Sequence, residues 1–263
     1  MADLGAILGD LATETQVIDD VVAALPASGW ARATPAEGWT IAHQIAHLAW
    51  TDRKSLVAAS RPEDFPGEVE KALSVGADFV DQGAAEGADK APRELLAEWR
   101  EGRTDLVVAL AAVPDGQKLP WYGPPMSAAS MATARMMETW AHGQDIFDAL
   151  GQERVPTARL WHIARFGTRT RDFAFKLNSL APPVDEFRVE LTAPDGSTWA
   201  FGPEDAEQRV TGSALDFCLV VTQRRHPDDT DLVATGEGAR EWLGIAQAFA
   251  GMPGAGRKAG QFS

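Results

Sequence analysis

The chain has 263 residues and a formal net charge of −14 at pH 7, from 24 basic and 38 acidic side chains. Nucleic-acid binding depends on clustered Lys and Arg, so this charge argues against a nucleic-acid partner and against an anionic membrane surface. The single cysteine, Cys218, excludes an internal disulfide and a cysteine-based zinc cluster. No apolar run approaches the ~20 residues that span a bilayer, and the N-terminus lacks a signal-peptide pattern, so we expect a cytoplasmic protein.

The first part of the chain is predicted to form four long helices. Apolar side chains recur at helical spacing in residues 4–25, 41–59, 92–110 and 128–150, with Thr, Pro and Gly at the expected ends. The stretch between the second and third helices, residues 60–91, holds eight acidic residues among Gly, Ala and Pro. It is predicted to be mostly a solvated connection, with room for a short helix. Four such helices in about 150 residues predict an antiparallel four-helix bundle.

The pattern changes after Pro156, and the rest of the chain is predicted to be a small α+β domain. The run FRVELTAPDGSTWAFGP has two alternating segments about an Asp-Gly turn, which is typical of a β-hairpin. The sequence therefore predicts two domains, residues 1–152 and 153–263. The further elements expected in the second are helices at 157–180, 214–224 and 239–250 and strands at 207–211 and 232–235.

Two of the long helices carry side chains with the spacing of metal ligands. His43 and His47 lie four residues apart on the second helix, and Glu138 and His142 lie four apart on the fourth. Residues i and i+4 share one helix face with Cβ atoms about 5–6 Å apart, so both can bind one ion. His47, Glu138 and His142 would together give three ligands and leave a position open, which is the ligand count of a catalytic site.

The competing interpretation is that these pairs arose by chance. Glu four residues before His is common on helix surfaces, where the two form an ordinary pair. Both candidate pairs, however, lie in apolar surroundings, His47 beside Ile45 and Leu48 and His142 beside Trp140. A buried carboxylate needs a strong partner, and a metal ion supplies one. This context favours the metal site.

The segments GWTIAHQIAHLAWTD and ARMMETWAHGQDIFDALG resemble the DinB-like metal-binding bundle family, and within it the mycothiol-dependent maleylpyruvate isomerase branch. The later segments LDFCLVVTQRR and EWLGIAQAFAG are similar to the C-terminal domain of that branch, so nearly the whole chain is covered. The resemblance implies a DinB-like bundle with His47, Glu138 and His142 as ligands of a divalent metal, zinc or alternatively nickel. It also implies mycothiol or a similar thiol as cosubstrate and a small electrophilic substrate.

Further residues are candidates for the site, with alternatives that the sequence leaves open. His43 is a fourth ligand, a hydrogen-bond partner of a ligand or a catalytic base, and the partner role is favoured over the ligand role. Arg135 either binds a carboxylate of the substrate or thiol, or neutralises Glu138. Trp121, in the loop PWYGPPM, either covers the metal and contacts the thiol or only packs.

Three functions compete. The leading hypothesis is an enzyme in which a metal activates a low-molecular-weight thiol for isomerisation or transfer, with Glu138, Arg135 and His43 as catalytic residues. In the isomerase branch, the resemblance implies that the thiolate adds to a conjugated cis double bond, which rotates before elimination. The alternatives are a non-catalytic protein that binds metal and a small ligand, and a hydrolase that uses metal-activated water.

Overall fold

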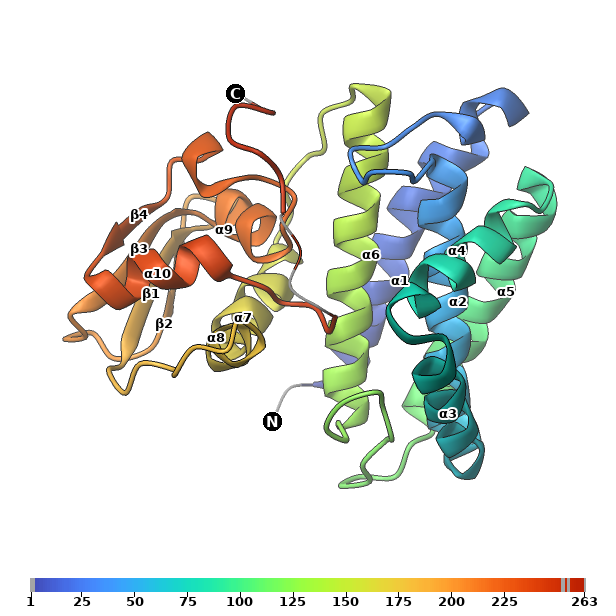
Figure 1. Ribbon diagram of the computed structural model, residues 1–263, viewed down its shortest axis with the longest axis horizontal. Coiled ribbons are helices and arrows are strands. Elements are labelled where there is room, and N and C mark those ends of the chain that lie inside the picture. Colours follow the sequence, from blue (N-terminus) through green and yellow to red (C-terminus); the bar gives the residue numbers. More distant parts are fainter. Residues whose placement is uncertain (1–2, 252–253, 255, 263) are drawn as a thin grey trace. The chain divides into compact units, whose positions relative to one another are not determined.

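The computed structural model describes residues 3–251, 254 and 256–262, and the chain divides into two compact units, Met1–Arg154 and Val155–Ser263. The described part of the first unit is helical, whereas the second combines helices with a sheet (Figure 1). An all-helical part is thus followed by a small α+β part, as predicted. Among the described residues, no helix is long and apolar enough to cross a membrane.

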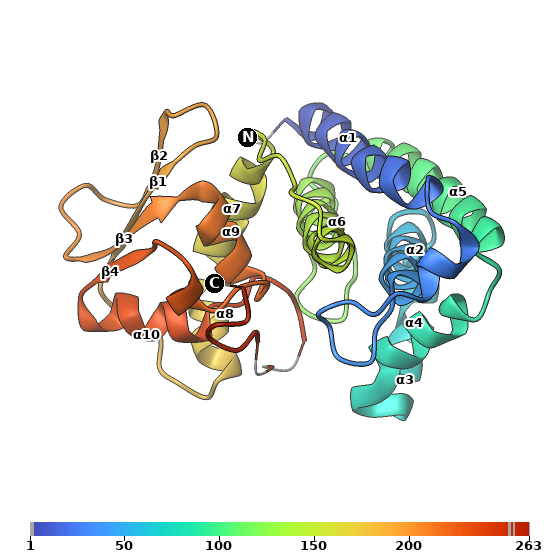
Figure 2. The same ribbon diagram turned by 90° about the horizontal axis from the view of Figure 1, so that it is seen from above.

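The described part of the first unit contains six α-helices rather than four. The four predicted segments are helical within about two residues of the expected limits. The bounds are α1 Leu4–Ala23, α2 Ile41–Ser60, α3 Phe65–Val75, α4 Phe79–Ala88, α5 Pro92–Ala111 and α6 Ala128–Leu150. In Figure 2, α2 and α6 are seen nearly end-on, and α5 and α4 lie on opposite sides of α2.

The prediction of a mostly solvated connection with a short helix over residues 60–91 understates its helical content, because this stretch forms two helices, α3 and α4, although many of its side chains are exposed. Glycines weaken a helix in isolation, but Gly83 and Gly87 allow α4 to lie unusually close to α2. A Cβ at Gly83 would lie 2.6 Å from the Trp50 ring, and one at Gly87 would lie 2.7 Å from the Ala46 Cβ. Tertiary packing on these two glycines therefore compensates for their low helix propensity.

This close packing gives a prediction with an internal control. Gly87→Ala should destabilise the protein by about 1–3 kcal/mol, because the added methyl overlaps Ala46 and forces α4 away from α2. Gly102→Ala in α5 adds its methyl to open space and should instead stabilise by up to about 1 kcal/mol through helix propensity. Urea denaturation of the two variants measures both effects, and equal midpoints would contradict the packing argument.

The hydrophobic core of the first unit consists of two clusters along the helices. One lies around Ile18, Ile45 and Trp99, between α1, α2, α5 and α6. The other lies around Phe65 and Met131. The buried faces of α2 and α6 therefore point at each other, and polar side chains on these faces meet inside the unit.

The second unit has a four-stranded sheet of order β2-β1-β3-β4. The central strands β1 and β3 are parallel, and each edge strand, β2 or β4, pairs antiparallel with its neighbour. The predicted hairpin is confirmed, with Thr192 opposite Thr198 across the turn. The strands are β1 Phe187–Thr192, β2 Thr198–Phe201, β3 Gln208–Ser213 and β4 Val233–Thr235, and the helices are α7 Leu160–Arg169, α8 Arg171–Leu177, α9 Ala214–Val221 and α10 Glu237–Ile245.

Two predictions for this unit are wrong in detail. The helix expected over residues 239–250 ends at Ile245, and the single helix expected over residues 157–180 is two helices. The break lies at Thr170, whose Oγ1 donates to the Gly167 carbonyl oxygen at 3.0 Å. Threonine side chains compete in this way with the backbone hydrogen bonds of a helix, which ends α7 and lets α8 start in a new direction.

Candidate metal site

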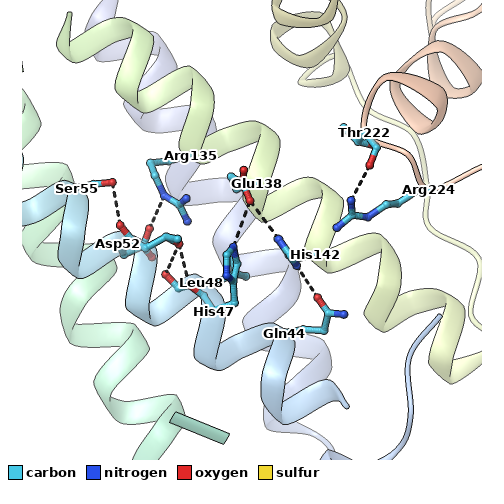
Figure 3. A network of polar contacts seen from close by, with 11 residues as sticks. Gln44, His47, Leu48, Asp52, Ser55, Arg135, Glu138, His142, Thr222 and Arg224 are labelled. Atoms are coloured by element: carbon cyan, nitrogen blue, oxygen red, sulfur yellow. Dashed lines mark hydrogen bonds and ion pairs between the residues drawn. The ribbon is translucent and has the colours of Figure 1, made fainter. Parts of the chain in front are cut away.

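The three predicted ligand side chains lie together in the first unit. His47 projects from α2, and Glu138 and His142 project from α6 toward it (Figure 3). Glu138 Oε2 lies 3.4 Å from His47 Nε2 and 3.2 Å from His142 Nε2, and the two imidazole centroids are 4.3 Å apart. One candidate ligand atom from each residue lies within 4.8 Å of the others, and no further His, Cys, Asp or Glu of the described residues joins this cluster.

The carboxyl group of Glu138 is held in its charged form. Burial by itself would raise its pKa, but the His142 and His47 rings that face the carboxylate outweigh burial and hold the pKa of Glu138 well below its ordinary range. The site thus offers one negative carboxylate and two imidazoles.

A chain of hydrogen bonds determines which ring nitrogen of His142 carries the proton. This relay ends on the Trp39 backbone carbonyl, which can only accept, and Thr34 Oγ1 donates to it at 3.0 Å. Gln44 Nε2 donates to Thr34 Oγ1 at 2.9 Å, so the carbonyl oxygen of the same amide faces His142 Nδ1 at 2.6 Å. Nδ1 therefore carries a proton, and Nε2, which points at Glu138, is the nitrogen that can bind a metal.

This donor set fits a divalent cation. His142 has a hydrogen-bond acceptor at each ring nitrogen, the Gln44 carbonyl oxygen and the Glu138 carboxylate. Its neutral form can donate to only one of them, whereas a cation near Nε2 would satisfy both the imidazole lone pair and the carboxylate. Two His nitrogens and one carboxylate oxygen on facing helices are a known ligand set of catalytic zinc. His47, Glu138 and His142 are therefore the residues that would hold the metal.

Arg135 lies one turn before Glu138 on α6, but it is bound to Asp52 of α2 rather than to Glu138. Its Nε donates to Asp52 Oδ1 at 2.9 Å, and the side chains are only 3% and 4% exposed. The other Asp52 oxygen accepts from the Trp99 indole at 3.2 Å. Arg135 Nη2 is buried and has no hydrogen-bond partner among the described residues. The pair thus positions Arg135 and leaves the two N–H groups of Nη2 without an acceptor among the described residues.

His43 and Trp121 are placed outside this cluster. His43 Nδ1 lies 2.8 Å from Thr40 Oγ1 and 3.4 Å from the Thr40 backbone nitrogen, so the ring caps the first turn of α2. Trp121 stacks on Phe65 at a centroid distance of 5.6 Å and contacts Tyr122, an arrangement that matches the packing alternative. The roles suggested for these residues in the reaction remain hypotheses.

The aromatic residue at the site is Trp39, which the sequence analysis did not single out. Its ring lies 5.4 Å from the His47 ring and 5.8 Å from the His142 ring, nearly parallel to the latter, with an angle of 20° between the planes. The available signal was its position directly before the Thr40 N-cap of the helix that carries His43 and His47. A bulky ring there can reach the face formed by the first two turns of α2.

This helical unit, with two imidazoles and a carboxylate on facing helices, belongs to a known family. Residues 11–147 match the family described as the mycothiol maleylpyruvate isomerase N-terminal domain, and the chain is a member of it. Two uncharacterized proteins of Mycobacterium tuberculosis, from strains CDC 1551 and H37Rv, are each 57% identical to it over 257 residues, which is 98% of this chain and 100% of the relative.

Solved structures show the same fold. The crystal structure of the mycothiol-dependent maleylpyruvate isomerase matches with a TM-score of 0.58 at 18% identity, covering 85% of this chain and 90% of the other. A histidine-to-alanine mutant of that enzyme matches with a TM-score of 0.59 at 17% identity, covering 88% and 92%. In the second unit, residues 183–235 also match a family described as wyosine base formation.

Proposed function

We propose that the protein is a divalent-metal-dependent enzyme that activates a low-molecular-weight thiol, mycothiol or a similar compound, for isomerisation or sulfur transfer on a small electrophilic substrate. The observation that carries this proposal is the convergence of His47, Glu138 and His142 in a chain of the mycothiol maleylpyruvate isomerase N-terminal domain family. All three side chains lie in the first unit, which supports assigning metal binding to the predicted domain of residues 1–152.

A divalent cation bound here, zinc or nickel, would lower the pKa of a thiol near it and so supply a thiolate at neutral pH. Glu138 contributes the one negative charge among the three side chains, which leaves the site a net positive charge toward an incoming anion. Gln44 holds His142 with Nε2 directed into the site. These contacts support a preorganised set of cation-binding side chains in the proposal.

Arg135 is proposed to bind a carboxylate of the substrate or of the thiol. Its Nη2 is a buried donor without a partner among the described residues, and an unmet charged donor is costly unless water or a ligand satisfies it. Asp52 occupies Nε and so fixes the direction in which the rest of the guanidinium points (Figure 3). A carboxylate is the complementary partner for the remaining N–H groups.

In the isomerase form of the proposal, the thiolate sulfur adds to one carbon of a conjugated cis double bond. The new C–S bond forms as the π electron pair moves onto the conjugated carbonyl oxygen, and the former double bond can then rotate. The electron pair returns, the C–S bond breaks and the thiolate is regenerated with a trans product. In the transferase form the adduct gains a proton and is released. Arg135 would hold the substrate carboxylate throughout.

Cobalt substitution tests the proposal directly. Protein loaded with Co²⁺ and titrated with mycothiol should develop a sulfur-to-metal charge-transfer band, and the same mycothiol should support turnover of a cis-configured, conjugated keto-diacid. The Glu138→Gln variant, loaded at equal cobalt concentration, is the matched control and should show a weaker band or none.

Two outcomes contradict the proposal in different ways. An unchanged spectrum at saturating mycothiol, together with hydrolysis of an ester or amide, would identify water as the activated species. A charge-transfer band without turnover of any tested electrophile would favour a protein that binds metal and ligand without catalysis.

A further inference from the structure

Trp39 contacts more of the candidate metal site than any other aromatic side chain of the described residues. Its ring lies near both ligand imidazoles and also near His43, at a centroid distance of 6.3 Å. Aromatic rings at these separations restrict one another's rotation because each face is filled by its neighbour. The orientations of the His47 and His142 rings therefore depend on where the Trp39 indole lies.

The loop that carries Trp39 has an internal backbone hydrogen bond and is connected to His142 by side-chain hydrogen bonds. Thr34 and Trp39 pair through the backbone, with Thr34 N donating to the Trp39 carbonyl oxygen at 2.8 Å. Gln44 then joins the Thr34 hydroxyl to His142 Nδ1. The loop thus reaches the same imidazole twice, through this relay and through the stacked indole.

The indole also makes a hydrogen bond to a residue of α4. Trp39 Nε1 donates to Asp81 Oδ1 at 2.9 Å, across 42 residues of sequence. Asp81 lies in the first turn of α4, and Gly83 and Gly87 let that helix pack closely on α2 beside His47. The Asp81 side chain is exposed to solvent, and it accepts a hydrogen bond from the Trp39 indole. Any effect of Asp81 on the metal site is therefore expected to pass through Trp39.

We propose that Trp39 is a positioning residue of the metal site, held in place by Asp81, which orients the His47 and His142 rings and slows release of the bound cation. The inference rests on the proposed function, since it concerns retention of the metal that this function requires. Partners that orient metal ligands commonly change metal affinity by about 10–100-fold when they are removed. A hydrogen bond to one such partner should have a smaller effect.

The test measures the rate of zinc release from loaded full-length protein to an excess of the chromogenic chelator 4-(2-pyridylazo)resorcinol. Asp81→Ala should release zinc about fivefold faster, the rate equivalent of losing an ordinary hydrogen bond worth about 1 kcal/mol. Asp81→Asn keeps an acceptor oxygen and should behave like the parent protein. Glu86→Ala makes the same charge change on the exposed side of α4 and should have no effect.

The Trp39 variants show whether Asp81 acts through the indole. Trp39→Phe keeps an aromatic face but loses the N–H, so it should match Asp81→Ala, and combining the two should add nothing further. Trp39→Ala should release zinc about tenfold faster or more. A second readout is ¹⁹F NMR of protein containing 5-fluorotryptophan, in which the resonance missing in Trp39→Phe should shift both on zinc binding and in Asp81→Ala.

Parent-like zinc release in folded Trp39→Ala and Trp39→Phe would overturn the inference while leaving the proposed function intact. An Asp81→Ala effect that persists undiminished in the Trp39→Phe background would overturn the role of Asp81. Parent protein that takes up no zinc at all would overturn the proposed function and, with it, the role of Trp39.

Discussion

Glu138→Gln is expected to weaken zinc binding by more than 100-fold and to abolish thiol-dependent turnover. Glutamine preserves the shape of the side chain but removes the only negative charge among the three candidate ligand side chains. Loss of a partner that merely orients a ligand typically costs 10–100-fold in metal affinity, and loss of a charged ligand should cost more. Competition against a chelator of known affinity measures the change, with circular dichroism to verify the fold.

Two histidine variants serve as a second test and as a control for metal binding. His142→Ala removes a candidate ligand and should also release the ion, whereas His226→Ala alters a histidine at the N-cap of a short turn in the second unit and should retain it. Elemental analysis of the dialysed proteins should give about one ion per chain for the parent and His226→Ala. Equal metal content in Glu138→Gln, His142→Ala and the parent would show that these residues are not ligands.

Asp52→Ala is expected to lower the free energy of unfolding by about 3–5 kcal/mol, the cost typical of removing one partner of a buried ion pair. The substitution leaves the Arg135 guanidinium buried with its Nε unpaired and also removes the acceptor of the Trp99 indole. Urea unfolding of metal-free protein measures the effect without the added stabilisation that a bound ion would give.

The matching control replaces both partners by apolar residues of similar size. In the double variant Asp52→Leu, Arg135→Met no buried charge remains at this position, so much of the loss should be recovered. The double variant should nevertheless lose affinity for a carboxylate-bearing substrate if Arg135 binds it, seen as a raised KM. A cost below about 1 kcal/mol for Asp52→Ala would indicate that the pair is solvated, contrary to its burial.

The long helices and the ligand spacing could be predicted from sequence because both depend on local periodicity. The limits of α6, Ala128–Leu150, follow from an apolar repeat ended by Gly151, and the i,i+4 spacing of Glu138 and His142 then places both on one face. That His47 lies opposite them required only that α2 and α6 pack through their apolar faces.

The remaining features depend on contacts between segments far apart in the chain. The acidic stretch has the composition of a connection, and its part α4 packs closely on α2 through Gly83 and Gly87. Nothing in the spacing of Asp81 indicates that it accepts from an indole 42 residues earlier. The partner of Arg135 was equally hidden, since Asp52 is one of many acids and only the fold brings the two together.

The relay through Gln44 also constrains how this sequence can diverge. The Trp39 backbone carbonyl can only accept a hydrogen bond, and no side-chain replacement removes it. The Thr34 hydroxyl must therefore donate to this carbonyl and accept from the Gln44 amide. Valine at position 34 would leave a buried amide N–H without an acceptor, at a cost of about 1–3 kcal/mol. Positions 34 and 44 are therefore expected to covary among relatives, with a hydroxyl retained at the first wherever an amide is retained at the second.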